Sequence, residues 1–215
     1  QAETVVAVED KYRPYKPKRR TRAMIAREKG LEGLATYIMS SDAAVPVPEE
    51  ALKYLSEEHE VNDPDTAIKL ALDIIAGDIS DDADIRTWIR ELTAKEGVLI
   101  TTVVPAVKAE LEASGERSVY ENYFEFAEKV DGLPGHRVLA INRGENEKVL
   151  SVKLEAPVDK IEGRLFKDLK SSANKLTQQY IEEAASDAYK RLIAPSIETE
   201  IRNELTLGEI GRAHV

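Results

Sequence analysis

The 215-residue chain contains no cysteine, only 11 glycines and only three phenylalanines. Without cysteine there is no disulfide framework, no thiol nucleophile and no zinc site built from thiolates. So few glycines and phenylalanines argue against an all-β sandwich, which needs frequent turns and aromatic side chains. No apolar run approaches the roughly 20 residues that a membrane-spanning helix requires. These absences exclude disulfide-stapled domains and argue against β-sandwiches and transmembrane helices.

What remains is the composition of a helix-rich globular protein, with 42% hydrophobic and 33% charged residues. The length suits one large or two small domains. The absence of cysteine fits a reducing compartment, so we expect a cytoplasmic protein. The chain begins at Gln1 rather than at Met, and we therefore expect it to be a piece of a longer protein.

The hydrophobic periodicity predicts a mainly α fold, a multi-helix scaffold with a small two-stranded β-ribbon. Residues 99–104 are β-branched and predict one strand, and residues 149–154 alternate apolar and polar and predict its partner. We expect a helical region over residues 1–97, the ribbon with a short helix over 98–155, a second helical region over 156–206 and an appended tail over 207–215. Pro195 is expected to interrupt the last helical region.

The charge is strongly segregated along the chain. Residues 11–29 hold nine Lys or Arg and one acid, a formal charge of +8, whereas the whole chain carries −10. Pro14 and Pro17 predict that residues 11–20 are extended, and Thr21 can cap a following helix. A basic segment in an acidic protein points to an anionic partner, either nucleic acid or an acidic protein surface.

The basic segment supplies the candidate nucleic-acid-binding residues. Five cations can contact phosphates and two tyrosines can stack on bases: Lys16, Lys18, Arg19, Arg20, Arg22, Tyr12 and Tyr15. The alternative is intramolecular, with the guanidinium groups paired to carboxylates of the same protein. Helices flanking Gly30 also match a helix-turn-helix corner. Since the second of these, over residues 31–39, has one acid and no base, a packing corner is favoured over a DNA reader.

The sequence gives no support for catalysis. The three histidines, His59, His136 and His214, are scattered, and a metal site is not expected from them. Acids at positions 78, 81, 82 and 84 lack the spacing of a calcium loop and are better explained as helix caps. No glycine-rich phosphate loop or dinucleotide fingerprint is present. We therefore expect no enzyme activity, no metal and no cofactor.

Three separate motifs carry a family resemblance. They are YRPYKPKRRTR at residues 12–22, PGHRVLAINRGE at residues 134–145, and YKRLIAPSIE at residues 189–198, which leads into EIRNEL at residues 200–205. Together and in this order they resemble the Tex family of bacterial transcription accessory proteins, over roughly residues 9–206. Beyond residue 206 the family pattern, a long acidic helix, is no longer followed.

The resemblance implies a fragment of the helical amino-terminal half of a much longer protein. Family members continue into an RNase H-like domain, a helix-hairpin-helix module and an OB-fold RNA-binding domain, none of which is in this chain. The implied function is a scaffold that supports RNA or single-stranded DNA binding in transcription. The alternative is an interaction module that docks on RNA polymerase or another transcription protein without touching nucleic acid.

Overall fold

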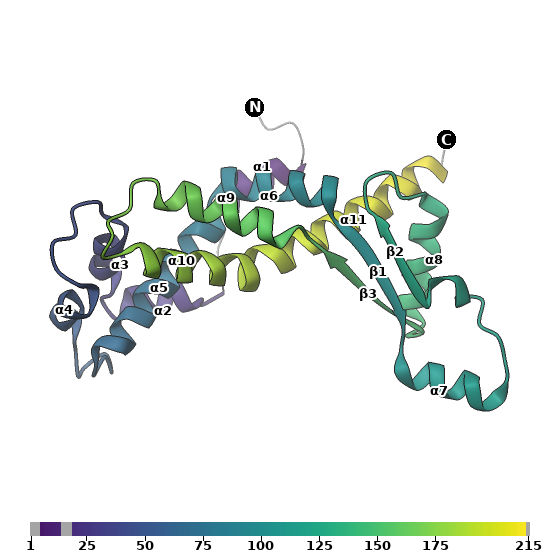
Figure 1. The fold of residues 1–215 in the computed structure, drawn as a ribbon, viewed down its shortest axis with the longest axis horizontal. Coiled ribbons are helices and arrows are strands. Elements are labelled where there is room, and N and C mark those ends of the chain that lie inside the picture. Colours follow the sequence, from purple (N-terminus) through teal and green to yellow (C-terminus); the bar gives the residue numbers. More distant parts are fainter. Residues whose placement is uncertain (1–4, 14–18, 214–215) are drawn as a thin grey trace. The chain divides into compact units, whose positions relative to one another are not determined.

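A computed structural model describes residues 5–13 and 19–213 of the chain (Figure 1). The chain divides into two compact units. Unit 1 comprises residues 1–88 and 159–196, and unit 2 comprises residues 89–158 and 197–215. The predicted fold class is confirmed, because helices dominate and the strands form one small sheet. In the described part of the chain, no helix is both long and apolar enough to cross a membrane.

Unit 1 is helical throughout. Its elements are α1 (Val5–Tyr12), α2 (Arg22–Glu28), α3 (Glu32–Met39), α4 (Val47–Ala51), a 3-10 turn (Leu52–Tyr54), α5 (Pro64–Asp81), the first part of α6 (Ala83–Glu96), α9 (Val158–Lys170), α10 (Gln178–Asp187), a π-helix (Ala188–Ile193) and the start of α11 (Ala194–Ala213).

Helix α5 is the centre of unit 1. It starts where the sequence predicts, because Asp63 accepts a hydrogen bond from the Thr66 amide (2.8 Å) and Pro64 occupies the first turn. Helices α2, α3, α4 and α10 pack on it. Gly77 lets α2 approach closely, since a Cβ at that position would lie 2.8 Å from the Cβ of Ala23. The core of unit 1 is thus a set of short helices around one long one.

The corner between α2 and α3 turns at Gly30, whose φ of +84° lies in the left-handed region that glycine adopts without strain. Leu31, Leu34 and Ile38 are fully buried behind this turn. The two helices of the expected corner are therefore present, and α3 uses its apolar face for packing within unit 1.

Two local expectations in unit 1 were wrong. Lys11 and Tyr12 belong to α1 rather than to an extended segment, because the helix continues until just before Pro14. Pro195 does not interrupt the last helical region. The chain stays helical through Pro195, because the preceding π-helix joins α10 to α11 without a break.

Unit 2 is built on a three-stranded antiparallel sheet. Its elements are the rest of α6, β1 (Val98–Val103), α7 (Pro105–Ser114), a 3-10 turn (Glu121–Tyr123), β2 (Glu125–Lys129), α8 (Gly135–Asn146), β3 (Leu150–Glu155) and the remainder of α11. The strand order is β2-β1-β3. Thr101 faces Phe126 on one neighbour and Val152 on the other.

The sheet has three strands, one more than the expected two-stranded ribbon. The pairing of β1 with β3 was predicted, whereas β2 was not. Its sequence, EFAEK, places charged residues at three of five positions, so its hydrophobic signal is weak. Glu125 and Lys129 are exposed and Phe126 is half-buried. The pairing with β1, rather than the local sequence, makes this segment a strand.

Candidate nucleic-acid interface

The structure places some of the predicted nucleic-acid-binding residues and not others. Arg19, Arg20 and Arg22 are exposed where the chain enters α2. Tyr12, at the end of α1, is 54% exposed. Tyr15, Lys16 and Lys18 lie outside the described residues. Four of the seven candidates are therefore described, and all four present their side chains to solvent.

The three exposed arginines differ in their partners. Arg20 donates from Nη2 to Oε2 of Glu28 at 2.5 Å, with both side chains more than half exposed. Surface pairs of this kind are worth about 0–1 kcal/mol, so this one is easily exchanged for another anion. Arg19 and Arg22 form no ion pair among the described residues. Intramolecular pairing therefore engages one of these three guanidinium groups, and only weakly.

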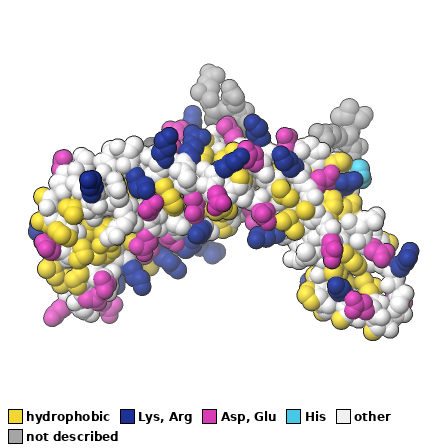
Figure 2. Space-filling model, in the orientation of Figure 1, with side chains coloured by type: hydrophobic (Ala, Val, Ile, Leu, Met, Phe, Trp, Pro, Cys, Tyr) yellow, Lys and Arg dark blue, Asp and Glu magenta, His cyan; other side chains and the backbone are white. Residues whose placement is uncertain are grey.

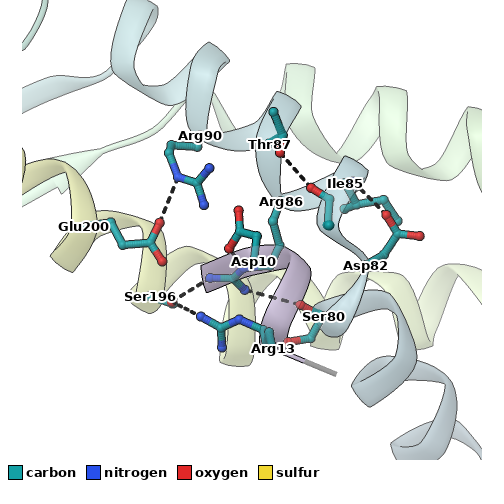
Figure 3. Close-up of polar contacts among 11 residues, drawn as sticks. Asp10, Arg13, Ser80, Asp82, Ile85, Arg86, Thr87, Arg90, Ser196 and Glu200 are labelled. Carbon is teal, nitrogen blue, oxygen red and sulfur yellow. Dashed lines mark hydrogen bonds and ion pairs between the residues drawn. The ribbon is translucent and has the colours of Figure 1, made fainter. Parts of the chain in front are cut away.

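The helix that precedes the basic segment is fixed by a buried arginine (Figure 3). Arg86 of α6 is fully buried, and its Nε lies 3.2 Å from Oδ1 of Asp10 in α1. Its Nη1 donates to the carbonyl of Ser80 (3.3 Å), and its Nη2 donates to Oγ of Ser196 (2.6 Å). The guanidinium group of this one residue, near the start of α6, thus connects α1 with the end of α5 and the start of α11.

The other end of the basic segment is fixed by a helix cap. Thr21 has extended backbone and its hydroxyl accepts a hydrogen bond from the Met24 amide at 3.2 Å, as the sequence predicted. At the first end, next to α1, Arg13 also contacts the Ser196 hydroxyl that Arg86 contacts, at 3.4 Å. Two points of the chain around the first half of the basic segment are therefore fixed, the buried Asp10 and the capped helix start at Thr21.

Sequence reasoning missed Arg86. The apolar residues of α6 recur at helical spacing, which favours a buried apolar face. Of Ile85, Trp88, Ile89 and Leu92, Ile89 is fully buried and the other three are half-buried. Arg86 lies three residues before Ile89 and shares its face. Its partners Asp10 and Ser196 are 76 and 110 residues away, so no local pattern reveals them.

A cavity of about 300 Å³ lies beside the basic residues in unit 1. Its charged lining comprises Arg13, Arg22, Arg27 and Arg191 together with Glu9, Asp73 and Asp81. Arg27 reaches Asp78 at 2.7 Å, and Arg191 reaches Asp187 at 2.8 Å. Burial raises the pKa of the Asp73 carboxyl, against the opposing effect of Arg191 and Arg22. The cavity mixes both signs of charge and does not by itself select an anion.

The other polar clusters have structural roles. Asp78 pairs with Arg27, and Asp82 caps α6 by accepting from the Ile85 amide at 2.9 Å. Arg137 pairs with Glu128 at 2.5 Å and lies 5.8 Å from the ring centre of Phe126, while Arg143 approaches Glu147 at 3.9 Å. Among residues 5–13 and 19–213, no three His, Asp or Glu side chains gather as a metal site would require.

Comparison with known proteins places the chain in a family. Residues 42–208 match the family described as Tex central region-like. The chain is 42% identical over 199 residues to the uncharacterized protein YdcI of Bacillus subtilis, covering 93% of this chain and 27% of that one. It is 40% identical over 158 residues to Protein tex of Bordetella pertussis, covering 74% of this chain and 19% of that one.

A more distant relative is human. S1 RNA-binding domain-containing protein 1 of Homo sapiens is 28% identical over 202 residues, which is 90% of this chain and 20% of the relative. The chain thus spans about a fifth to a quarter of the length of these relatives. The family match begins at residue 42, after the basic segment, and it includes residues of both units. The chain therefore belongs to the Tex family, and the resemblance carried by its three motifs is confirmed.

Proposed function

We propose that this chain is a scaffold of a Tex-like transcription accessory protein and that its basic segment contacts nucleic acid. The observation that carries the proposal is the exposure of Arg19, Arg20 and Arg22 next to two fixed points, the buried Asp10 and the capped Thr21. Cations that are held near a rigid body but left in solvent suit a phosphate backbone, because contact releases counterions at a small ordering cost.

The proposed partner is RNA or single-stranded DNA. Tyr12 is 54% exposed at the end of α1, and an exposed ring next to cations suits base stacking. Tyr15, Lys16 and Lys18 complete the proposed set. Among the relatives, one is named a transcriptional accessory protein and another carries S1 RNA-binding in its name, and both names fit this partner. The proposal assigns the protein to the cytoplasm and gives it no catalytic step.

The test is nucleic-acid binding as a function of salt. The 215-residue chain would be titrated against a fluorescent single-stranded RNA and a single-stranded DNA at several salt concentrations. A variant with Lys16, Lys18, Arg19, Arg20 and Arg22 changed to Ala loses five possible phosphate contacts. We expect its slope of log affinity against log salt to fall by up to about 3.5, since each contact to a single strand contributes about 0.7.

A charge-matched comparison isolates the described arginines. Arg19, Arg20 and Arg22 changed to Ala should weaken binding, whereas Lys69, Lys167 and Lys175 changed to Ala should not, because these lysines are equally exposed in unit 1 but outside the basic segment. Equal losses in the two triple variants would show that only net charge matters. If the wild-type chain binds neither RNA nor single-stranded DNA at low salt, the proposal is wrong.

The second candidate is a protein-docking module without nucleic-acid contact, acting on RNA polymerase or another transcription protein. The same experiment separates the two functions. A docking module gives no salt-dependent nucleic-acid binding. If the five basic residues instead stabilise the fold by pairing with carboxylates, the five-residue variant melts at a lower temperature than wild type. The exposure of Arg19, Arg20 and Arg22 favours the nucleic-acid proposal over a purely structural role for these residues.

A further inference from the structure

A second charged surface follows the basic segment in unit 1. Residues 31–66 contain nine acids and one Lys, a formal charge of −8. Eight of these nine acids are exposed, and only Glu50 is buried. Figure 2 shows acidic and hydrophobic side chains gathered over the α3–α4 end of this unit. A basic partner is therefore attracted to this end of unit 1.

An apolar groove lies between α3 and α5 beside this acidic surface. Its volume is about 430 Å³. Ile75 and Ile79 of α5 form its floor, and Ala35 and Met39 of α3 form its wall. The groove is large enough to hold one large apolar side chain of a partner, and α3 leaves it uncovered.

Met39 is the exposed apolar side chain of the groove. It is 40% exposed, whereas Ile75 and Ile79 are 3% and 5% exposed. A methionine fits irregular partner surfaces because its unbranched side chain is flexible and polarizable. Apolar anchors that fill such pockets supply most of the binding energy in protein interfaces.

The rim of the groove carries unbalanced negative charge. Glu32 and Asp78 both line the groove, and their side chains are 68% and 62% exposed. Both carboxylates approach one guanidinium group, that of Arg27, at 3.6 Å and 2.7 Å. Two carboxylates facing one cation leave a net charge of −1 at the rim, where a partner Lys or Arg finds an acceptor.

We propose that the α3–α5 groove binds a basic segment of another protein, with a large apolar side chain inserted against Met39 and a flanking Lys or Arg at Glu32 and Asp78. The charge of −8 over residues 31–66 steers such a segment to the groove, and the apolar floor holds it. The proposal does not depend on nucleic-acid binding, because none of Arg19, Arg20 and Arg22 lines the groove.

The test uses a fluorescein-labelled 16-residue peptide with Leu and Lys at helical spacing, titrated against the 215-residue chain and followed by anisotropy. Two further peptides, one with Glu in place of Lys and one with Ser in place of Leu, remove one attraction each. We expect the Leu–Lys peptide to bind, the Glu peptide not to bind, and the Ser peptide to bind at least about tenfold more weakly. Tight binding of the Ser peptide would reduce the site to non-specific charge attraction and overturn the proposal.

Two groove variants have matched controls. Met39→Asn removes the apolar wall without adding charge, and Leu139→Asn changes a similarly exposed side chain (47%) on α8. The double change Glu32→Gln and Asp78→Asn removes the rim charge, and Glu110→Gln with Glu112→Gln removes two exposed acids of α7. We expect at least a fivefold loss of peptide affinity for each groove variant and less than a twofold change for each control. Equal affinities for groove and control variants would overturn the proposal.

Sedimentation velocity addresses a competing occupant, the basic segment of a second copy. The proposal expects a monomer across the micromolar range. Self-association that Met39→Asn abolishes would assign the groove to a second copy and overturn the proposal. Circular dichroism melting of every variant verifies that the chain is folded, and because Met39, Glu32 and Asp78 are exposed, we expect little change in melting temperature.

Discussion

Asp10 and Arg86 form an ion pair with almost no contact with water: Arg86 is 0% exposed, Asp10 is 1% exposed, and Nε lies 3.2 Å from Oδ1. A charge this deeply buried is stable only when it is paired and its remaining donors are satisfied. Arg86 meets that condition with the Ser80 carbonyl and the Ser196 hydroxyl. The position of α1, and with it the start of the basic segment, thus depends on one arginine of α6.

Removing one partner of this buried pair should be costly. Asp10→Ala leaves the Arg86 guanidinium without its carboxylate, and we expect the free energy of unfolding to fall by about 3–5 kcal/mol. Urea denaturation followed by circular dichroism measures the loss. Arg20→Ala, which removes the exposed pair with Glu28, is the control and should cost no more than about 1 kcal/mol. Similar losses for both variants would contradict the anchoring role of Asp10.

Replacement of glycine by alanine should lower the stability of the chain at Gly144 and raise it at Gly163. At Gly144 in α8, an added Cβ would lie 2.6 Å from Cδ1 of Leu150, so Gly144→Ala should destabilise the chain by about 1–2 kcal/mol through overpacking. At Gly163 in α9 an added Cβ meets nothing within 4 Å, so Gly163→Ala should stabilise by about 0.5–1 kcal/mol through helix propensity. Thermal melting of the two variants distinguishes these signs.

Tyr189 should make stability fall at alkaline pH. Burial, and to a smaller extent Glu162, raises the pKa of Tyr189 to about 12 from an ordinary value of 10.0. Above pH 10 the unfolded chain loses this proton while the folded chain keeps it, so stability is complete below pH 10 and decreases as the pH rises toward 12. The contribution amounts to about 1 kcal/mol between pH 9 and 11.

Tyr189→Phe removes this contribution. The variant should lose about 1 kcal/mol less than wild type between pH 9 and 11 when urea denaturation is repeated across that range. Tyr12→Phe, at an exposed tyrosine, should follow the wild-type profile. If the free energy of unfolding of Tyr189→Phe depends on pH in the same way as that of wild type, another group causes the loss of stability at alkaline pH.

The single tryptophan provides a probe of unit 1. The guanidinium carbon of Arg164 in α9 lies 4.2 Å from the ring centre of Trp88 in α6. Arg164→Leu removes this cation–π contact, which should cost about 0.5–1 kcal/mol and change the fluorescence emission of Trp88. Arg143→Leu, at an exposed arginine of α8, should leave the emission unchanged. Emission that is insensitive to Arg164→Leu would contradict the contact.

Local chemistry explains which parts of the fold could be predicted. The starts of α2 and α5 follow from Thr21 and Asp63, because a cap is a contact between residues three positions apart. Strand β2 and the burial of Arg86 could not be predicted in this way. The first depends on pairing with β1, and the second depends on partners 76 and 110 residues away.

Some features of the candidate site could likewise be predicted from the sequence, and others could not. The type and density of charge in residues 11–29 point to an anion from the sequence alone. The exposure of Arg19 and Arg22, and the pairing of Arg20 with Glu28, are properties of the folded chain. The same is true of the α3–α5 groove, since its two walls come from helices separated by the whole of α4.

The π-helix Ala188–Ile193 has a consequence for how this chain tolerates a change of length. The Ala194 amide donates to the carbonyl of Tyr189, five residues earlier, so this turn encloses one residue more than an α-helical turn. Loss of a single residue here, such as the exposed Lys190, converts the turn to α-helix and keeps the later buried side chain Ile193 on the same face as Ile181 and Ala185. A deletion inside α5 would instead rotate every later side chain by about 100°. A variant one residue shorter in this turn can therefore keep the same core.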